Sequence, residues 1–322
     1  MGIVVAQAAG PGGFPEFVNA LASGIALGAI YATLALGFVL IFKATQVVNF
    51  AHGAIAALGA YLVSYFATAL NVPGRWVPGL PPTAQWFLSV VVAVAVTALI
   101  GIAIERVTIR PMIGEPLFSV AMITLGLDLV IRTVTNDFMN NQVRGLGDPF
   151  GSQVIEIGFF RIAQTQVVTI VVALLLMVYL AWFFRTRMGV AMRATAFDQE
   201  AAMAQGIDVG KVFAVAWAIG AGLAAIGGIF SSVFPRGAGV SPFTFAIAFR
   251  AFPAVVIGGL DSIVGAIVGG MLVGVAEVLA GTYLTQKFLG QGFAGIVPWL
   301  FMMLVLLIKP YGLFGTEEVR RV

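Results

Sequence analysis

Cysteine is absent from this 322-residue sequence, and histidine occurs only once. The absence of cysteine excludes structural disulfides, thiolate metal sites and cysteine nucleophiles. The single histidine, His52, leaves no zinc or haem ligand set and no readable Ser-His-Asp arrangement. We therefore expect this chain to hold no metal or cofactor and to carry out no covalent catalysis.

Charged residues are also scarce. They make up 10 % of the sequence, whereas a soluble domain carries roughly 25 %. Hydrophobic residues account for 60 %, and the mean hydropathy is +1.04. Because such an inventory cannot cover a water-facing surface, the composition predicts an all-α integral membrane protein. The net charge of +3 is typical of basic cytoplasmic loops and does not require a nucleic acid partner.

Nine apolar segments have the length and composition of helices that cross a hydrocarbon core about 30 Å thick. They cover residues 17–42, 47–70, 85–104, 117–135, 165–184, 212–234, 243–260, 263–281 and 293–308. Segment 243–260 carries Arg250 and Pro253, and segment 293–308 is short. Either could be a re-entrant or broken helix that lines a cavity. We expect a polytopic bundle of about 8–10 transmembrane helices.

One membrane domain, residues 17–309, is the simplest organisation for these segments. Residues 1–16 are rich in glycine and proline and lack a basic start, so they predict a flexible tail rather than a signal peptide. Residues 310–322 would form a cytoplasmic C-terminal tail. With the N-terminus outside, the inner loops hold ten lysines and arginines and the outer loops five, which favours that orientation.

The inner loop between the fifth and sixth segments, residues 185–211, contains a short helix that a simple connection does not require. Thr195, with Asp198 three residues later, has the pattern of a capping box at the start of this helix. Gly206 can supply the left-handed turn that ends it. Asp208 can then cap the next membrane helix.

The same helix has small side chains at Ala201, Ala202 and Ala204, so a groove on another protein could receive it at close range. Glu200-Ala201-Ala202 followed by Gly206 resembles the Glu-Ala-Ala loop of ABC importer permeases. In that superfamily the loop forms a cytoplasmic coupling helix that docks in a cleft of the ATPase subunit. The resemblance implies that Glu200, Ala201, Ala202 and Gly206 couple this chain to an ATPase.

Three further segments resemble permeases for branched-chain, or hydrophobic, amino acids. They are residues 24–37 (GIALGAIYATLALG), 48–61 (VNFAHGAIAALGAY) and 254–270 (AVVIGGLDSIVGAIVGG), and the similarity extends over most of 24–315. The run from Asn49 to Gly53 is the most specific element. The resemblance implies an inner-membrane importer assembled from this permease, a second homologous permease, two ATPase subunits and an extracytoplasmic solute-binding protein. Relatives carry amides, urea or short acids too, so the cargo stays open.

ATP hydrolysis belongs to a partner in this interpretation. The sequence contains no Gly-x-x-x-x-Gly-Lys-Ser/Thr loop to cradle phosphates, and the run from Gly206 to Val212 is one residue short of it. The chain is therefore expected to be a transport subunit and not an enzyme. An ion-coupled secondary transporter remains the alternative, because Asp128 and Glu277 could bind coupling ions.

Polar groups inside membrane helices are costly and usually face a cavity or one another. This reasoning selects five candidates for the substrate pathway: Asn49, His52, Thr124, Arg250 and Glu277. Each has a structural alternative. Asn49 could cap a helix, His52 could bond a neighbouring helix, and Arg250 could pair with Glu277. Asp128 and Arg132 are four residues apart, which favours a structural ion pair.

Overall fold

The computed structural model describes residues 13–112, 115–151, 153–234, 239–284 and 292–316. Within this part of the chain, seven helices are long and apolar enough to cross a membrane. They are α1 (Phe14–Thr45), α2 (His52–Ser64) with its π-helical extension to Leu70, α3 (Pro82–Ile104), α4 (Leu117–Phe138), α5 (Gln164–Phe183), α8 (Val209–Val233) and α10 (Ile263–Tyr283). The architecture is a polytopic all-α bundle, as the composition predicts.

The remaining two apolar segments form shorter helices. Segment 243–260 contains α9 (Ala246–Gly258), with 13 residues, and segment 293–308 contains α11 (Val297–Ile308), with 12. At 1.5 Å per residue neither helix spans about 30 Å. The described residues therefore hold seven full-length helices, fewer than the 8–10 expected, because the two weakest segments are only partly helical.

Residues 1–12 of the predicted N-terminal tail and residues 317–322 of the predicted C-terminal tail lie outside the described residues. Helix α1 begins at Phe14, so the last residues of the stretch 1–16 are helical and the expected boundary at 17 is three residues late. Pro15 suits this start, because its missing N–H group would lack a partner in the first turn anyway.

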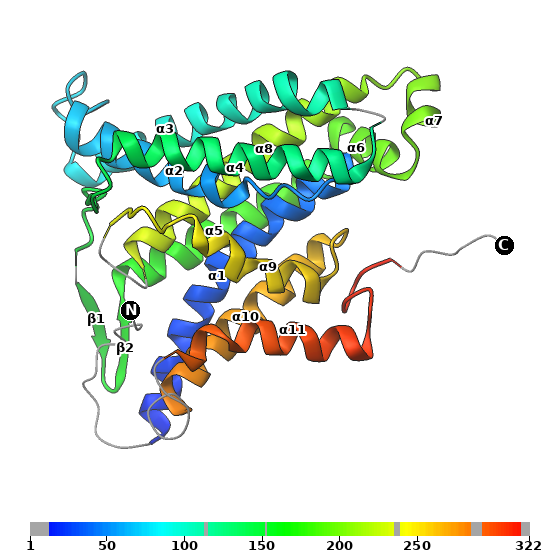
Figure 1. Ribbon diagram of the computed structural model, residues 1–322. Helices are drawn as coiled ribbons and strands as arrows, with labels where there is room; N and C mark the ends of the chain where they lie inside the picture. Colours follow the sequence, from blue (N-terminus) through cyan, green and yellow to red (C-terminus); the bar gives the residue numbers. More distant parts are fainter. Residues whose placement is uncertain (1–12, 113–114, 152, 235–238, 285–291, 317–322) are drawn as a thin grey trace.

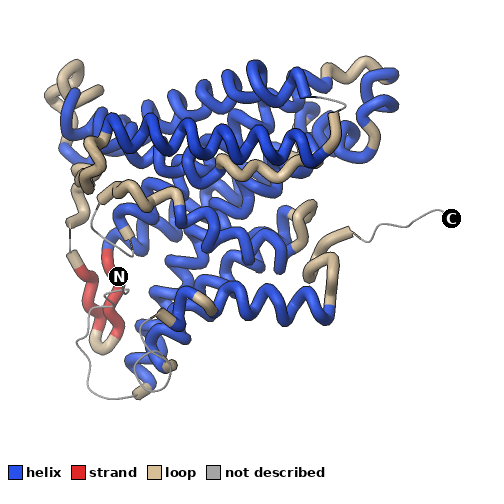
Figure 2. Tube along the Cα trace, in the orientation of Figure 1, coloured by secondary structure: helices blue, strands red, loops and turns tan. Residues whose placement is uncertain are grey.

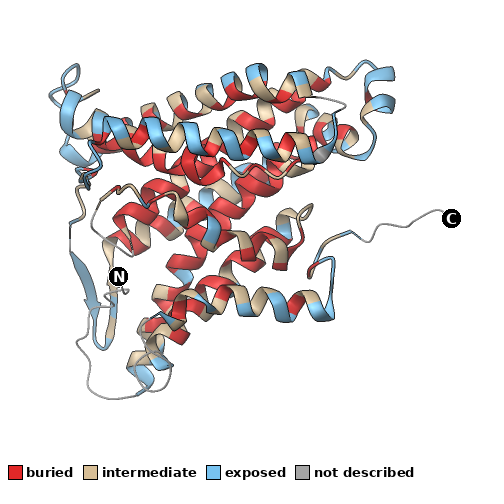
Figure 3. Ribbon diagram, in the orientation of Figure 1, coloured by how far each residue is buried: buried red, intermediate tan, exposed pale blue. Residues whose placement is uncertain are grey.

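Helices α1 and α8 form the buried centre of the bundle, while α3, α4 and α5 expose apolar side chains on its outside (Figure 3). Small residues permit a close contact between α1 and α10. A Cβ atom added at Gly274 of α10 would lie 2.2 Å from the backbone nitrogen of Gly28 on α1. Close backbone approach of this kind stabilises helix pairs in lipid, where the hydrophobic effect does not bring helices together.

The two ends of the bundle differ in structure (Figures 1 and 2). One end carries the start of α1 and an antiparallel hairpin of β1 (Val154–Ile157) and β2 (Phe160–Ala163). The opposite end carries the short helices α6 (Arg187–Phe197) and α7 (Gln199–Ala204) and the last described residues of the chain. This separation agrees with termini on opposite sides of a membrane.

Two helices begin inside the bundle. After α1 ends at Thr45, the chain turns back, and the ring of His52 at the start of α2 stacks on Phe38 with centroids 4.1 Å apart. Phe38 lies seven residues before Thr45, about 10 Å back along the helix. Helix α9 begins beside α2, since a Cβ atom added at Gly53 would lie 2.4 Å from the carbonyl oxygen of Phe245.

Candidate coupling surface and substrate pathway

The loop predicted to hold one short helix holds two, α6 and α7. The hydroxyl of Thr186 accepts a hydrogen bond from the backbone N–H of Gly189 and caps α6, at 3.3 Å. The carboxylate of Asp198 accepts from the N–H of Ala201 at 2.9 Å and caps α7. The predicted cap at Thr195 is wrong. Thr195 lies within α6, and its buried hydroxyl has no hydrogen-bond partner among the described residues.

The other end of α7 follows the prediction. Gly206 has φ +80°, in the left-handed region that favours glycine. Its N–H donates to the carbonyl of Met203 at 2.9 Å, and the N–H of Ile207 donates to the carbonyl of Ala202 at 3.0 Å. These two bonds form a Schellman motif, which satisfies the last carbonyls of a helix. The turn directs the chain from α7 straight into α8.

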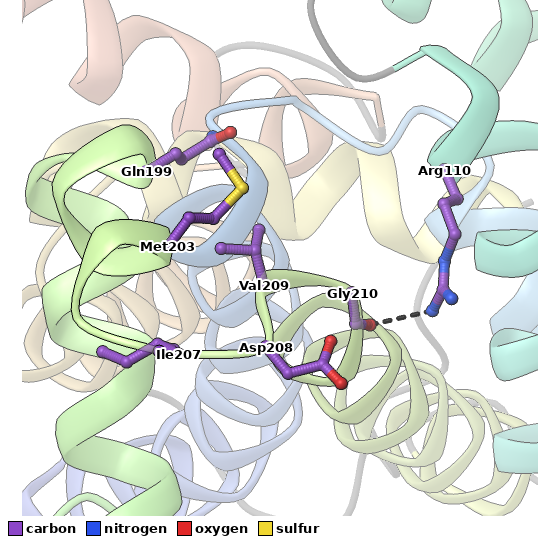
Figure 4. Close-up of a pocket in the computed structure, with 8 residues that line it drawn as sticks. Arg110, Gln199, Met203, Ile207, Asp208, Val209 and Gly210 are labelled. Atoms are coloured by element: carbon purple, nitrogen blue, oxygen red, sulfur yellow. Dashed lines mark hydrogen bonds between the residues drawn. The ribbon is translucent and has the colours of Figure 1, made fainter.

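An open groove of about 530 Å³ lies between α7 and the start of α8 (Figure 4). Met203 of α7 lies on the side of the groove opposite Arg110, and Gly206 also lines the groove. The guanidinium of Arg110 donates to the carbonyl of Gly210 at 2.9 Å and forms a two-pronged pair with Glu105, with both N–O distances 3.0 Å. Arg110 therefore fixes the end of α3 to the first turn of α8.

The four predicted coupling residues have different environments. Gly206 lines the groove. Glu200 and Ala201 are exposed beside it, whereas Ala202 is buried against the bundle. The same surface exposes two large apolar side chains, Met203 at 54 % and Phe197 at 95 %. Phe197 ends α6, and no pattern in the sequence indicates that its ring would be exposed.

Asp208 joins this surface to the membrane helices. Its carboxylate accepts from the backbone N–H of Lys211 at 3.0 Å and caps α8, as predicted. That bond, with a contact to the Lys211 ammonium at 3.2 Å, holds the pKa of Asp208 below its usual value of 3.8.

The cap should therefore survive moderate acid. A carboxyl group whose pKa is lowered by folding stabilises the folded state above its ordinary pKa, and this contribution is lost as the pH falls through the lowered value. We expect Asp208→Ala to lower the melting temperature at pH 7 and to have a smaller effect near pH 3. Asp208→Asn, which also caps, is the control. Equal losses at both pH values for Asp208→Ala would contradict this role.

Two of the predicted pathway residues hold the segment that precedes α2. The side-chain oxygen of Asn49 accepts from the N–H of Ala51 at 3.1 Å, and the hydroxyl of Thr124 on α4 accepts from the N–H of Phe50 at 3.3 Å. Both side chains are buried. The amide nitrogen of Asn49 has no hydrogen-bond partner among the described residues. Asn49 thus shapes a turn with its oxygen and keeps a donor free.

His52 is fully buried behind Phe38. Its ring faces the backbone of Leu34, but neither ring nitrogen makes a regular hydrogen bond within the described part of the chain. It therefore reaches no accessible surface in this structure. Any effect of His52 on a pathway would pass through Phe38.

The predicted ion pair between Asp128 and Arg132 is present, with an N–O distance of 3.8 Å. The Asp128 carboxylate also faces the backbone N–H of Ala54 in the first turn of α2, where the helix dipole favours an anion. The Arg132 guanidinium lies 4.4 Å from the ring centre of Phe245. Helix α4 therefore holds the starts of both α2 and α9 through this pair.

Arg250 and Glu277, two pathway candidates, also pair with each other. A nitrogen of Arg250 on α9 lies 3.3 Å from one carboxylate oxygen of Glu277 on α10. The hydroxyl of Tyr31 on α1 donates to the other oxygen at 2.6 Å. The Glu277 carboxylate is buried, whereas a third of the Arg250 side chain is exposed. Of the five pathway candidates, Arg250 alone reaches the surface, and Tyr31 is a partner that the sequence did not reveal.

Comparison with known proteins places this arrangement in a family. Residues 20–308 match the family described as branched-chain amino acid transport system / permease component. The chain is 31 % identical over 315 residues, 96 % of this chain and 99 % of the other, to the high-affinity branched-chain amino acid transport system permease protein LivH of Salmonella typhimurium. The corresponding protein BraD of Pseudomonas aeruginosa is 29 % identical, covering 95 % of this chain and 98 % of the relative. A probable permease LivH of Methanocaldococcus jannaschii is 31 % identical, covering 88 % of each chain. This polytopic membrane protein therefore belongs to the family of branched-chain amino acid transport permeases.

Proposed function

We propose that this chain is a membrane-spanning subunit of an ATP-driven ABC importer that carries branched-chain or other hydrophobic amino acids across the inner membrane. The names of its relatives support the cargo class. The observation that carries the importer assignment is the surface formed by α6, α7 and the groove. Its helices are capped, it exposes Phe197 and Met203, and it lies at the end of the bundle opposite the hairpin.

An ATPase subunit would dock on this surface. An almost fully exposed aromatic side chain is unfavourable in water, and its burial in a partner's pocket releases free energy. This is typical of the side chains that anchor a protein interface. A second permease would bind alongside the bundle, with one ATPase under each permease. The end with the β1–β2 hairpin would face the solute-binding protein outside the membrane.

The contacts provide a route for motion from the ATPase to the bundle. The Schellman turn at Gly206 joins α7 to α8 without a flexible linker, and the Asp208 cap holds the first turn of α8. Arg110 links that turn to α3. Closure of the ATPases on ATP would displace α7, α8 and α3 together. Hydrolysis in the ATPases would reset the path to its starting state.

The charged residues of the bundle favour this function over ion-coupled transport. A secondary transporter needs acids that are available to bind protons or ions. Asp128 is paired with Arg132, and Glu277 is paired with Arg250. Both acids therefore have structural partners. Uptake that persists without ATP and collapses with an uncoupler would support the secondary transporter instead.

Affinity purification of the chain from native membranes in mild detergent, followed by mass spectrometry, tests the proposal. We expect an ATPase and a related permease to copurify, and the reconstituted complex to import leucine only with ATP. A chain that purifies alone and moves solute without ATP would rule the importer out.

The same experiment tests the docking anchor. We expect Phe197→Ala to reduce the copurified ATPase at least about tenfold, because loss of an interface anchor typically costs about 2 kcal/mol or more. The melting temperature of the isolated chain should not change, since Phe197 is 95 % exposed. Phe138→Ala, at the far end of α4 and 67 % exposed, is the matched control. Full retention of the ATPase by Phe197→Ala would contradict docking at α6 and α7.

A further inference from the structure

An apolar pocket opens where the starts of α2 and α9 meet inside the bundle. Its volume is about 200 Å³. The wall is formed by one residue of α1, one just before α2, one of α2, three of α9 and one of α11: Phe38, Phe50, Gly53, Ala248, Phe249, Phe252 and Trp299. Gly53 is essential to this geometry, because any side chain there would collide with the Phe245 carbonyl and push the start of α9 away.

The pocket lies at a place in the bundle that is typical of substrate sites in transporters. Membrane transporters place their substrate sites where helices are interrupted, because irregular backbone at membrane depth is tolerated only where it is buried or lines a cavity. Here the starts of α2 and α9 touch at the pocket wall, and α4 holds both through Thr124 and Arg132. The pocket is thus built by fixed elements and is not a gap between loosely packed helices.

We propose that this pocket receives the aliphatic side chain of the cargo during transport, an inference that rests on the proposed function. Pockets for drug-sized ligands measure roughly 300–1,000 Å³, and a cavity of about 150 Å³ can hold benzene. A pocket of about 200 Å³ therefore fits a group of a few carbon atoms, such as the side chain of leucine, isoleucine or valine.

The chemistry of the wall selects the class of cargo. Five of the seven lining residues carry aromatic rings and the other two are glycine and alanine, so buried amides, urea or carboxylates would lose hydrogen bonds to water without replacement. An aliphatic group loses none. The pocket therefore favours an aliphatic amino acid over an amide, urea or a short acid.

Phe249 offers the sharpest test because it lines the pocket and is 43 % exposed, so its replacement leaves the core intact. In liposomes containing the complete complex, Phe249→Trp should reduce leucine uptake about tenfold relative to alanine uptake, because a single methylene in an apolar pocket is worth tenfold or more. Phe249→Ala should shift preference the other way, toward phenylalanine. Phe243→Trp, the same exchange at a 71 % exposed position outside the pocket, is the control.

Thiol labelling supplies a readout that does not depend on turnover. Because the chain has no cysteine, Phe249→Cys places its only thiol in the pocket, and Phe243→Cys places one outside it. We expect leucine, but not glycine, to slow maleimide labelling at 249 and not at 243, without ATP. Unchanged labelling and an unchanged leucine-to-alanine ratio would overturn the pocket. If the Phe249→Ala variant failed to retain the second permease in the complex while its substrate preference stayed unchanged, the proposal would also be overturned. That result would show that a side chain of the second permease, and not the cargo, occupies the pocket. Absence of ATP-dependent uptake by the unaltered complex, with leucine protection at 249 intact, would instead refute the importer.

Discussion

Arg250→Ala should lower the free energy of unfolding by about 3 kcal/mol, because breaking a buried ion pair by removing one partner takes the counter-charge away from the other. The carboxylate of Glu277 is buried and would lose its nearby guanidinium, while the hydrogen bond from the Tyr31 hydroxyl would stay. Helix α9, which spans 13 residues and contains Pro253, would also lose its charged link to α10. Thermal unfolding of the detergent-solubilised chain measures the effect.

The matched control removes both charges. The double variant Arg250→Met, Glu277→Leu should recover most of the lost stability, because an apolar pair of similar volume often replaces a buried ion pair without loss. Glu277→Gln alone should be milder than Arg250→Ala, because a third of the Arg250 side chain is exposed and can find other partners. A double variant as unstable as Arg250→Ala would contradict this prediction. It would show that these side chains stabilise the bundle through their packing and not through their charges.

Gly206→Leu should reduce ATP-dependent uptake about tenfold while the bundle remains folded. Gly206 has φ +80°, and a residue with a side chain in this region loses about 1–2 kcal/mol. Space is available at the position, since nothing lies within 4 Å of an added Cβ atom. The strain therefore acts on the backbone of α7, which has six residues and little stability of its own.

Gly206→Asn distinguishes backbone strain from loss of a contact, because asparagine tolerates the left-handed conformation better than other residues. We expect this variant to keep most of the uptake, and both variants to keep the melting temperature of the bundle within a few degrees. Uptake and ATP hydrolysis should be measured together in liposomes. Equal transport by Gly206→Leu and the unaltered protein would count against α7 as the coupling element.

Sequence patterns found the contacts that are local. Gly206 and Asp208 were identified as caps because each acts on backbone groups within a few residues. Asp128 and Arg132 were paired because residues four apart share a helix face. Thr195 was misassigned because both it and Asp198 have suitable side chains, and the break between α6 and α7 makes Asp198 the cap.

The pair of Glu105 and Arg110 shows where local reasoning ends. These residues are five apart, a spacing that does not align side chains on an α-helix. The turn from Glu105 to Ile109 is a π-helix, whose wider turn brings positions five apart together. Arg110 therefore contacts Glu105 and also lines the groove beside α7. In the sequence it is only one of several basic residues near the end of an apolar segment.

The sequence by itself determined the solvent of this protein, the positions of its apolar segments, the caps at Gly206 and Asp208, and the family resemblance. Those features depend on composition and on contacts between near neighbours. Only the tertiary structure decided that Tyr31 and Glu277, 246 residues apart, share a hydrogen bond, and that rings from three helices and from the segment before α2 line one pocket. Packing of distant helices sets these contacts, and no periodicity within a single helix records which neighbour it will meet.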